Sequence, residues 1–414
     1  MKSLNSPDLA ARSLAALWHP CTQMARAAVT PPLAIARGEG PWLFDLEGRR
    51  YFDANSSWWV NLFGHSDAGI RAAITHQLET LPHVMLAGCT HAPAVELAEK
   101  LSALTGGALG HAFFASDGAS AVEIALKMSF HSWSNRGQAV AVFRDAYDPL
   151  LMRAHIVDSP DARQGPGSEA RALADLRRVL TARRGHVAAL IIEPLVQCAA
   201  GMAMHEPSYL RAVRALCDEF DIHLIADEIA VGCGRSGTFF AFEQGECGWP
   251  DFITLSKGIS GGTLPLSLVL TTETVYQSFW SEQVGRGFLH SHSYTGNALA
   301  CAAANAVLDR FAADQVLEKN RVQAGLLAEA FAPLATDPRV HHLRQRGMIL
   351  AFDVREPGER FAERFHLAAR AHELLIRPIG ATVYLMPPYL IDAPAAQFLF
   401  QAVMATLSEV LDAA

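Results

Sequence analysis

Three residues of types that could act together on a small molecule are Lys257, Asp227 and Gly118. Each comes one to three residues after a short apolar run of the kind that forms a buried strand. The three runs are His111–Ala115, Ile222–Ala226 and Phe252–Leu255. Because open parallel sheets bind ligands at the carboxyl ends of their strands, we expect these residues to form one site.

Lys257 is the candidate nucleophile. The chain has only five lysines, and Lys257 alone follows an apolar strand and enters a glycine-rich turn. Partial burial would lower the pKa of its amine and favour the neutral form that condenses with a carbonyl to form an imine. The alternative is an exposed loop lysine, and the presence of Asp227 and Gly118 at other strand ends argues against it.

Asp227 and Gly118 supply two further parts of such a site. A carboxylate directly after apolar residues is partly desolvated, and the protonated nitrogen of a pyridine ring would be a suitable partner. A helix cap or a salt bridge is the alternative for Asp227. Gly118 precedes a predicted helix, whose first backbone N–H groups could bind a phosphate. By itself this second signal is weak, because glycine is common before helices.

The elements that must position these residues alternate between strands and helices from about residue 65. This pattern predicts an α/β fold with a mostly parallel sheet covered on both faces. After about residue 311 the pattern changes to that of a smaller α+β domain. We therefore predict an N-terminal segment (1–64) that contributes to the small domain, a large cofactor-binding domain (65–311) and a C-terminal small domain (312–414).

Composition excludes several classes of protein. The formal net charge of −8 argues against a nucleic-acid-binding protein, which would carry a basic face. No apolar run is long enough to span a bilayer, and the first residues lack the apolar stretch of a signal peptide. The seven cysteines are scattered, without a C-x-x-C pair. We therefore expect a cytoplasmic protein with reduced thiols, without membrane association and without a metal site.

Four segments resemble the class III aminotransferases of pyridoxal 5′-phosphate (PLP) fold type I. They are Ile192-Glu-Pro194, Ala226-Asp-Glu-Ile229, Gly232-Cys-Gly-Arg-Ser-Gly237 and Ser256-Lys-Gly258. The resemblance implies that Lys257 holds PLP as a Schiff base and moves a proton, and that Asp227 binds the ring nitrogen. It also implies a homodimer, with a phosphate site formed by Gly118 and Ala119 and completed by His292 and Ser293 of the partner subunit.

Further motifs are similar to the branch of this family that serves biotin biosynthesis. They are Trp18-His-Pro-Cys-Thr-Gln-Met24, Ser56-Ser-Trp-Trp59, Thr90-His-Ala-Pro93, His290-Ser-His-Ser-Tyr-Thr-Gly-Asn297, Ile376-Arg-Pro378 and Tyr384-Leu-Met-Pro-Pro388. That branch transfers the amino group of S-adenosylmethionine to 8-amino-7-oxononanoate. The resemblance implies that Arg377 receives the carboxylate of the keto acid, as suits a bidentate guanidinium. It further implies that Trp58, Tyr384, Ser291 and Cys21 contact substrates.

The sequence departs from the family pattern at three places. Cys21 stands where the family has a tyrosine, and Ala119 stands where it has a hydroxyl residue, for which Ser120 is a possible substitute. A Gly-Tyr-His-Gly motif, whose tyrosine stacks on the cofactor, is missing around residues 135–145, and Tyr147 lies in the wrong context to replace it. Two alternatives therefore stay open, namely a class III ω-aminotransferase of other specificity and a non-catalytic relative.

Overall fold

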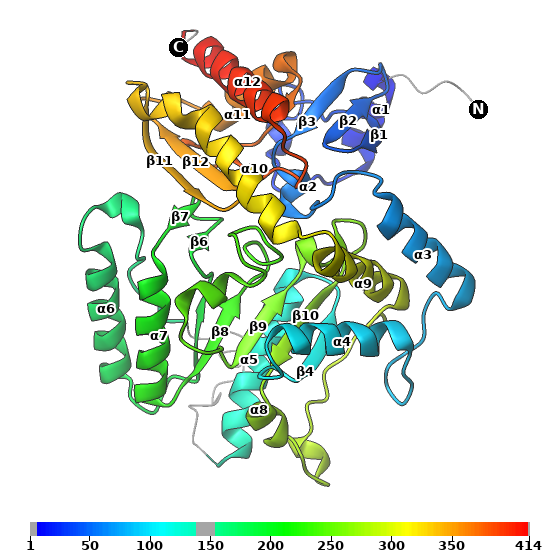
Figure 1. Ribbon diagram of the computed structural model, residues 1–414, viewed down its shortest axis with the longest axis vertical. Coiled ribbons are helices and arrows are strands. Elements are labelled where there is room, and N and C mark those ends of the chain that lie inside the picture. Colours follow the sequence, from blue (N-terminus) through cyan, green and yellow to red (C-terminus); the bar gives the residue numbers. More distant parts are fainter. Residues whose placement is uncertain (1–5, 138–153, 413–414) are drawn as a thin grey trace. The chain divides into compact units, whose positions relative to one another are not determined.

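The computed structural model describes residues 6–137 and 154–412. The chain divides into two compact units (Figure 1). The first unit combines Met1–Ala68 with Lys319–Ala414, and the second consists of Gly69–Glu318. The predicted domain boundaries after residues 64 and 311 stay a prediction.

The second unit is built on a five-stranded sheet with the order β4-β10-β9-β8-β5. Strands β5, β8 and β9 pair in parallel, whereas β10 is antiparallel to both of its neighbours, β9 and β4. Four strands therefore run in one direction, which confirms the predicted mostly parallel α/β sheet. The strands are β4 (His111–Ala115), β5 (Ala189–Ile192), β8 (His223–Asp227), β9 (Phe252–Leu255) and β10 (Ser267–Thr271).

Helix α5 (Gly118–Asn135) contacts all five strands of this sheet. Its apolar residues Ala121, Ile124, Ala125 and Met128 recur at the helical spacing and are buried, so one stripe of the helix faces the strands. The other helices of this unit pack beside the sheet or against one another. Helix α7 contacts β8 and α6, and α4 contacts α9. These helices are α3 (Ala68–Thr80), α4 (Ala92–Leu104), α6 (Ser168–Ala182), α7 (Pro207–Phe220), α8 (Glu273–Gln277) and α9 (Ala298–Ala313), with a small ribbon of β6 (Val196–Gln197) and β7 (Ala203–Met204).

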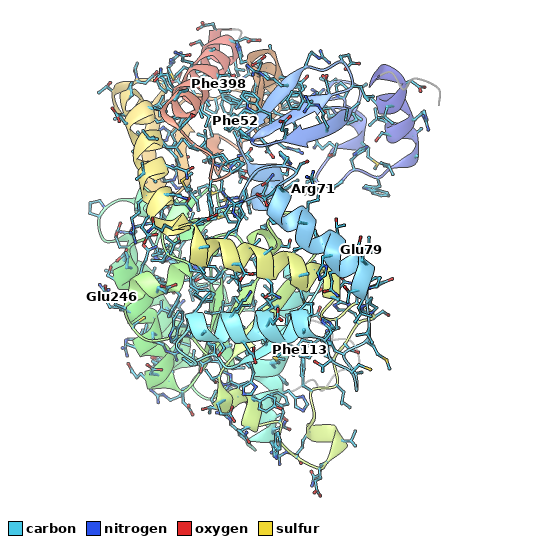
Figure 2. All side chains as sticks on the ribbon, turned by 45° about the vertical axis from the view of Figure 1, so that its right-hand side comes forward. Phe52, Arg71, Glu79, Phe113, Glu246 and Phe398 are labelled. Carbon is cyan, nitrogen blue, oxygen red and sulfur yellow. The ribbon has the colours of Figure 1, made fainter. Side chains whose placement is uncertain are left out.

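The first unit contains two sheets, ordered β1-β2-β3-β13 and β11-β12-β14. Parallel pairing of β3 with β13 joins the N-terminal segment to the C-terminal one. The aromatic rings of Phe52 and Phe398, labelled in Figure 2, lie 6.0 Å apart in its core. The strands are β1 (Ile35–Glu39), β2 (Trp42–Asp45), β3 (Arg50–Asp53), β11 (Val340–Arg346), β12 (Ile349–Val354), β13 (Leu374–Leu375) and β14 (Thr382–Leu385).

Helices α1 (Ser6–Ala16), α2 (Ser56–Trp59), α11 (Phe361–Ala369) and α12 (Ala393–Asp412) complete the first unit. Helix α10 (Val316–Phe331) begins in the second unit and continues into the first. Within residues 6–137 and 154–412, none of the helices combines the length and the apolar character needed to cross a bilayer.

Candidate active site

The ends of β8 and β9 bring the predicted carboxylate and amine together. Asp227 is the last residue of β8 and pairs with Thr254 of β9. Lys257 follows β9 after one intervening residue and opens the short 3₁₀ turn Lys257–Ser260. Its φ of 47° lies in the left-handed region. A residue with a Cβ is strained there, and such strain is concentrated at functional sites.

The two side chains have complementary electrostatics. Burial lowers the pKa of the Lys257 amine, and the nearby Asp227 partly offsets this effect. Burial raises the pKa of the Asp227 carboxyl, against the opposing effect of its hydrogen bonds and of Lys257. The result is an amine that loses its proton more easily than an exposed lysine and a carboxylate that gains from a cationic neighbour.

The carboxylate of Asp227 is held through one of its oxygens. The backbone N–H of Ile229 and the hydroxyl of Thr254 both donate to Oδ1, at 3.1 and 3.2 Å. In the part of the chain that the structure describes, no hydrogen bond to Oδ2 is recorded. That oxygen is therefore available for a further donor, such as a protonated ring nitrogen.

Glu193 is a third titratable group near Lys257 that the sequence analysis did not assign to the site. It follows β5, and its Oε2 accepts a hydrogen bond of 3.0 Å from the backbone N–H of Cys198. Burial raises the pKa of Glu193 to about 7, with a further contribution from Asp227. The signal for this residue was present, because Glu193 directly follows an apolar strand just as Asp227 does.

The predicted phosphate-binding segment forms the beginning of α5. Asp117 is the N-cap residue, and its Oδ1 accepts the backbone N–H of Ser120 at 2.9 Å. The Ser120 hydroxyl donates to Oδ2 of the same carboxylate at 2.8 Å, so it is engaged in the cap. A Cβ on Gly118 would lie 3.0 Å from Cδ1 of Ile229, so glycine allows Ile229 to pack closely here. The side chain of Ala119 is exposed.

The segment that contains Ser291, His292 and Ser293 lies beside the start of α5 in the same chain. Nε2 of His292 is 3.4 Å from the hydroxyl of Ser116. The carbonyl oxygen of Ser293 is 2.8 Å from Nε2 of His83, and the side chains of Ser291 and Ser293 are exposed. His292 is therefore close to the predicted phosphate-binding segment of its own chain, and its role towards a partner subunit stays a prediction.

Trp58 lies on an unusual turn in the first unit. All four residues of α2, Ser56 to Trp59, have positive φ values of 48–74°. Consecutive left-handed residues are costly for residues with a Cβ. The buried carboxylate of Asp53 stabilises this turn by accepting the backbone N–H and the hydroxyl of Ser57, at 2.9 and 2.7 Å. The turn buries Trp59 and leaves Trp58 46% exposed.

The buried amide of Asn55 connects Arg377 and Tyr384 within this unit. Its Oδ1 accepts the backbone N–H of Arg377 at 2.7 Å, and its Nδ2 donates to the carbonyl oxygen of Tyr384 at 3.0 Å. The Arg377 guanidinium lies 5.6 Å from the centre of the Trp58 ring, within the range of a cation–π contact. Tyr384 is buried, and its hydroxyl accepts a hydrogen bond from Nε1 of Trp59. Asn55 was not among the site residues predicted from the sequence.

Arg377 is exposed and, among the described residues, forms no ion pair. Its guanidinium is therefore available to a carboxylate of another molecule.

Cys21 lies between α1 and β1 with an exposed thiol and a φ of 49°. The Gly-Tyr-His-Gly motif is predicted to be missing around residues 135–145. Residues 138–153, which include Tyr147, lie outside the described part of the chain.

Comparison with protein families identifies one match, "Aminotransferase class-III", over residues 23–154 and 143–407. The two matched stretches overlap over residues 143–154, beside residues 135–145, where a family motif is predicted to be missing. The match accounts for most of both units.

Curated relatives are similar over nearly the whole chain. The adenosylmethionine-8-amino-7-oxononanoate aminotransferase of Helicobacter pylori is 40% identical, and the alignment covers 98% of each chain. That alignment spans 436 positions, more than the 414 residues of this chain, so the relative has residues without a counterpart here. The protein of the same name from Geobacter sulfurreducens is 37% identical over 92% of this chain and 93% of its own.

Solved structures with the same fold include three transaminases. The adenosylmethionine-8-amino-7-oxononanoate aminotransferase of Methanocaldococcus jannaschii superposes with a TM-score of 0.89 at 30% identity, over 97% of this chain and 98% of its own. An (S)-enantioselective omega-transaminase from Thermomicrobium roseum has a TM-score of 0.90 at 28% identity, over 100% of both chains. A PLP-bound amine transaminase from an uncultivated Pseudomonas species has a TM-score of 0.87 at 28% identity, over 95% and 99%.

Proposed function

Because the chain belongs to the class III aminotransferases, we propose that it transfers the amino group of S-adenosylmethionine to 8-amino-7-oxononanoate. The product is 7,8-diaminononanoate, an intermediate of biotin biosynthesis. The observation that carries this proposal is the 40% identity, over 98% of both chains, to a relative named for this reaction. The chain is an aminotransferase, and its cofactor is PLP.

The residues at the strand ends fit this cofactor. When bound, PLP supplies an aldehyde that condenses with amines and a protonated ring that withdraws electrons from the reacting carbon. Lys257 offers an amine whose pKa is lowered by burial, as condensation requires. Asp227 offers a buried carboxylate whose recorded hydrogen bonds both end on Oδ1, which leaves Oδ2 for the ring nitrogen.

Each of these residues has one task in the proposed reaction. Lys257 would hold the cofactor, and its Nζ would move the proton from Cα of the donor to C4′ of the cofactor. Asp227 keeps the ring nitrogen protonated. The backbone N–H groups of Gly118 and Ala119 bind the phosphate at the positive end of α5.

Arg377 and Trp58 are the proposed determinants for the keto acid. An exposed guanidinium can bind the carboxylate of 8-amino-7-oxononanoate through two parallel hydrogen bonds. The nearby indole of Trp58 keeps this guanidinium oriented through a cation–π contact and offers an apolar surface to the aliphatic chain of the substrate. Tyr384, Ser291 and Cys21 are further substrate contacts in this proposal.

The proposed assembly is a cytoplasmic homodimer in which His292 and Ser293 serve the phosphate site of the partner subunit. Exposed apolar side chains next to these residues support an interface. Leu289 and Tyr294 are 81% and 63% exposed, and Met85, in a segment that contacts Tyr294 through His83, is 61% exposed. Light scattering tests the assembly, because a dimer has twice the chain mass of 44.8 kDa.

A class III ω-aminotransferase of other specificity is the second candidate. The similarity to the omega-transaminase of Thermomicrobium roseum favours it, because the two chains cover one another completely. The two candidates differ in the amino donor. A donor screen that compares S-adenosylmethionine with simple amines, with 8-amino-7-oxononanoate and with pyruvate as acceptors, separates them.

The decisive experiment is an absorbance spectrum of the purified protein with PLP, before and after S-adenosylmethionine is added. We expect a yellow band of bound PLP that disappears on addition of the donor, followed by formation of 7,8-diaminononanoate when the keto acid is added. A folded protein that stays colourless would instead identify a non-catalytic relative that lost the tyrosine-bearing motif. Loss of the band with simple amines alone would identify the ω-aminotransferase.

A further inference from the structure

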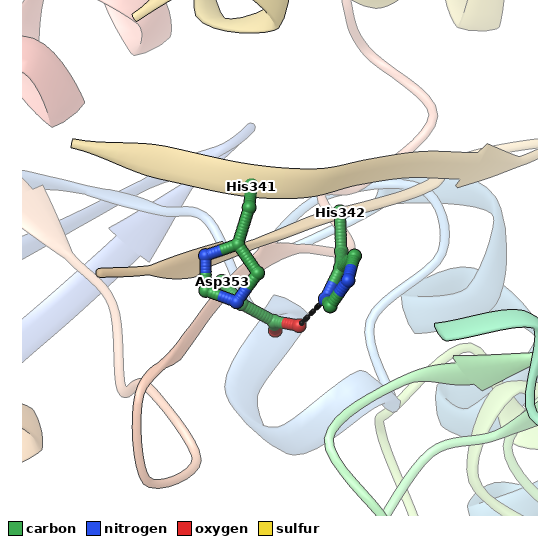
Figure 3. Close-up of side chains that lie close together, drawn as sticks. All are labelled: His341, His342 and Asp353. Atoms are coloured by element: carbon green, nitrogen blue, oxygen red, sulfur yellow. Dashed lines mark hydrogen bonds and ion pairs between the residues drawn. The ribbon is translucent and has the colours of Figure 1, made fainter. Parts of the chain in front are cut away.

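Two imidazoles and a carboxylate converge on the three-stranded sheet of the first unit, among residues that the proposed reaction does not use. His341 and His342 belong to β11, and Asp353 belongs to the neighbouring strand β12. One possible ligand atom from each residue lies within 4.8 Å of those from the other two. Figure 3 shows the two imidazoles on either side of the Asp353 carboxylate.

A β-bulge produces this convergence. His341 pairs with Asp353, but the next recorded pair is Arg344 with Ala351, so β11 has one residue more than β12 between these pairs. His342, within the bulge, has a φ of 52°. In a regular strand the side chains of His341 and His342 would point to opposite faces of the sheet. The bulge redirects the second imidazole, and its Nδ1 lies 3.0 Å from Oδ2 of Asp353.

The carboxylate of Asp353 is oriented by two other side chains. Its Oδ1 accepts the hydroxyl of Thr382 at 2.7 Å and the guanidinium of Arg344 at 3.0 Å. These two donors meet the carboxylate at Oδ1, whereas His342 meets it at Oδ2. Second contacts of this kind fix the direction of a metal ligand and tune its affinity.

His341 is the third possible ligand of this group. Its Nδ1 is buried and, within the described residues, has no hydrogen-bond partner. The positive φ of His342 is a cost of this arrangement.

We propose that His341, His342 and Asp353 form a binding site for Zn²⁺ or a similar late first-row divalent cation. Two imidazole nitrogens and one carboxylate oxygen suit these metals and leave one position for water. Mg²⁺ and Ca²⁺ prefer sites made entirely of oxygen ligands, which this group is not. The bound ion would link β11 to β12 at the bulge and stabilise the first unit.

The test uses the untagged, PLP-loaded protein after treatment with a chelator. We expect one equivalent of Co²⁺ per chain, seen as visible absorption at longer wavelength than the cofactor band, and displacement of Co²⁺ by Zn²⁺. His341→Ala and His342→Gln should each weaken binding at least ~10-fold. The exposed His76 on α3 supplies the matched control His76→Ala, which should bind as the unchanged protein does.

A second measurement distinguishes a built site from surface binding. The electron paramagnetic resonance spectrum of one added equivalent of Cu²⁺ should show two nitrogen ligands, and His342→Gln should reduce them to one. Zn²⁺ should also raise the unfolding temperature of the unchanged protein but not that of His341→Ala. Binding that is absent, or that is unaffected by both substitutions while circular dichroism shows a folded protein, would overturn the proposal.

Discussion

The imidazole of His223 stacks on the indole of Trp133, with ring centroids 4.3 Å apart and planes inclined by 23°. His223 begins β8, the strand that ends in Asp227, and Trp133 lies in α5. The Ser129 hydroxyl is 2.7 Å from Nδ1 of His223. This buried contact joins the strand that ends in Asp227 to the helix that begins at the predicted phosphate-binding segment.

The stacked pair predicts sensitivity to acid. Burial lowers the pKa of His223 from 6.5 to about 4. Between these values the unfolded chain binds a proton that the folded protein does not, so the free energy of unfolding falls as pH decreases from about 6.5 to about 4. The loss reaches about 3 kcal/mol. His223→Gln should remove this part of the loss of stability in acid. The measurement is unfolding followed by tryptophan fluorescence at a series of pH values.

The exposed His76 is the control for this prediction, because His76→Gln should leave the loss of stability in acid unchanged. If His223→Gln lost stability in acid as the unchanged protein does, other groups would be the cause of the sensitivity.

Replacement of Lys257 with alanine should abolish turnover, because no other amine follows the apolar strand that ends near Asp227. The measurement is formation of 7,8-diaminononanoate together with the PLP absorbance band. Lys127→Ala is the matched control, because Lys127 is 46% exposed and pairs only with Glu123 in the recorded ion pairs. Such a surface pair contributes at most about 1 kcal/mol to stability. A fully active Lys257→Ala protein would exclude the proposed mechanism.

Glu193 should influence how activity depends on pH. Its pKa is about 7, and its negative charge above that pH favours the protonated form of Lys257. Glu193→Gln removes this charge, so the pKa of Lys257 should fall and the limb of kcat/KM near pH 7 should weaken or disappear. The measurement is kcat/KM as a function of pH for Glu193→Gln, with Glu282→Gln, at an exposed position, as the control variant. Coincident profiles of the Glu193 variant and the unchanged protein would show that Glu193 has a structural role only.

Ala119→Ser should strengthen the binding of PLP. The serine restores a hydroxyl at the start of α5, where the hydroxyl of Ser120 is already engaged by Asp117. A hydrogen bond to a charged group contributes about 1.5–3 kcal/mol, so the dissociation constant should fall roughly 10- to 100-fold. Equilibrium titration of the protein with PLP measures this. Ala119→Val, which adds volume without a donor, should bind no more tightly; equal affinities of all three proteins would place Ala119 away from the phosphate.

Asn55→Ala should impair use of the keto acid more than the chemical step. The substitution leaves the backbone N–H of Arg377 and the carbonyl oxygen of Tyr384 without their amide partner. Each unsatisfied group costs about 1–3 kcal/mol, and relaxation of the chain would displace Arg377. We expect KM for 8-amino-7-oxononanoate to rise about 10-fold, with a smaller change in kcat, in steady-state assays at saturating donor.

Asn135→Ala is the control, because Asn135 also donates to a backbone carbonyl oxygen but lies in α5. An unchanged KM in a folded Asn55→Ala protein would show that this amide does not position Arg377.

Local sequence was sufficient for several elements. The apolar run His111–Ala115 became β4, and Phe252–Leu255 became β9, with the bounds that the sequence predicted. Such runs are recognisable because burial of a strand on both faces requires consecutive apolar residues. Strands β10 and β11 were not predicted from the sequence, although β10 is equally apolar.

By itself the sequence determined the kind of chemistry, because the lysine, the carboxylate and the glycine each follow a strand and their motifs are contiguous. Only the tertiary structure decided which strands are neighbours, and it inserted the antiparallel β10 between β4 and β9. It also decided that Glu193 lies near Lys257, that Asn55 joins Arg377 to Tyr384, and that a bulge turns His342 onto Asp353. These relationships depend on contacts and strand pairings between residues that are not neighbours in the chain, which local periodicity does not specify.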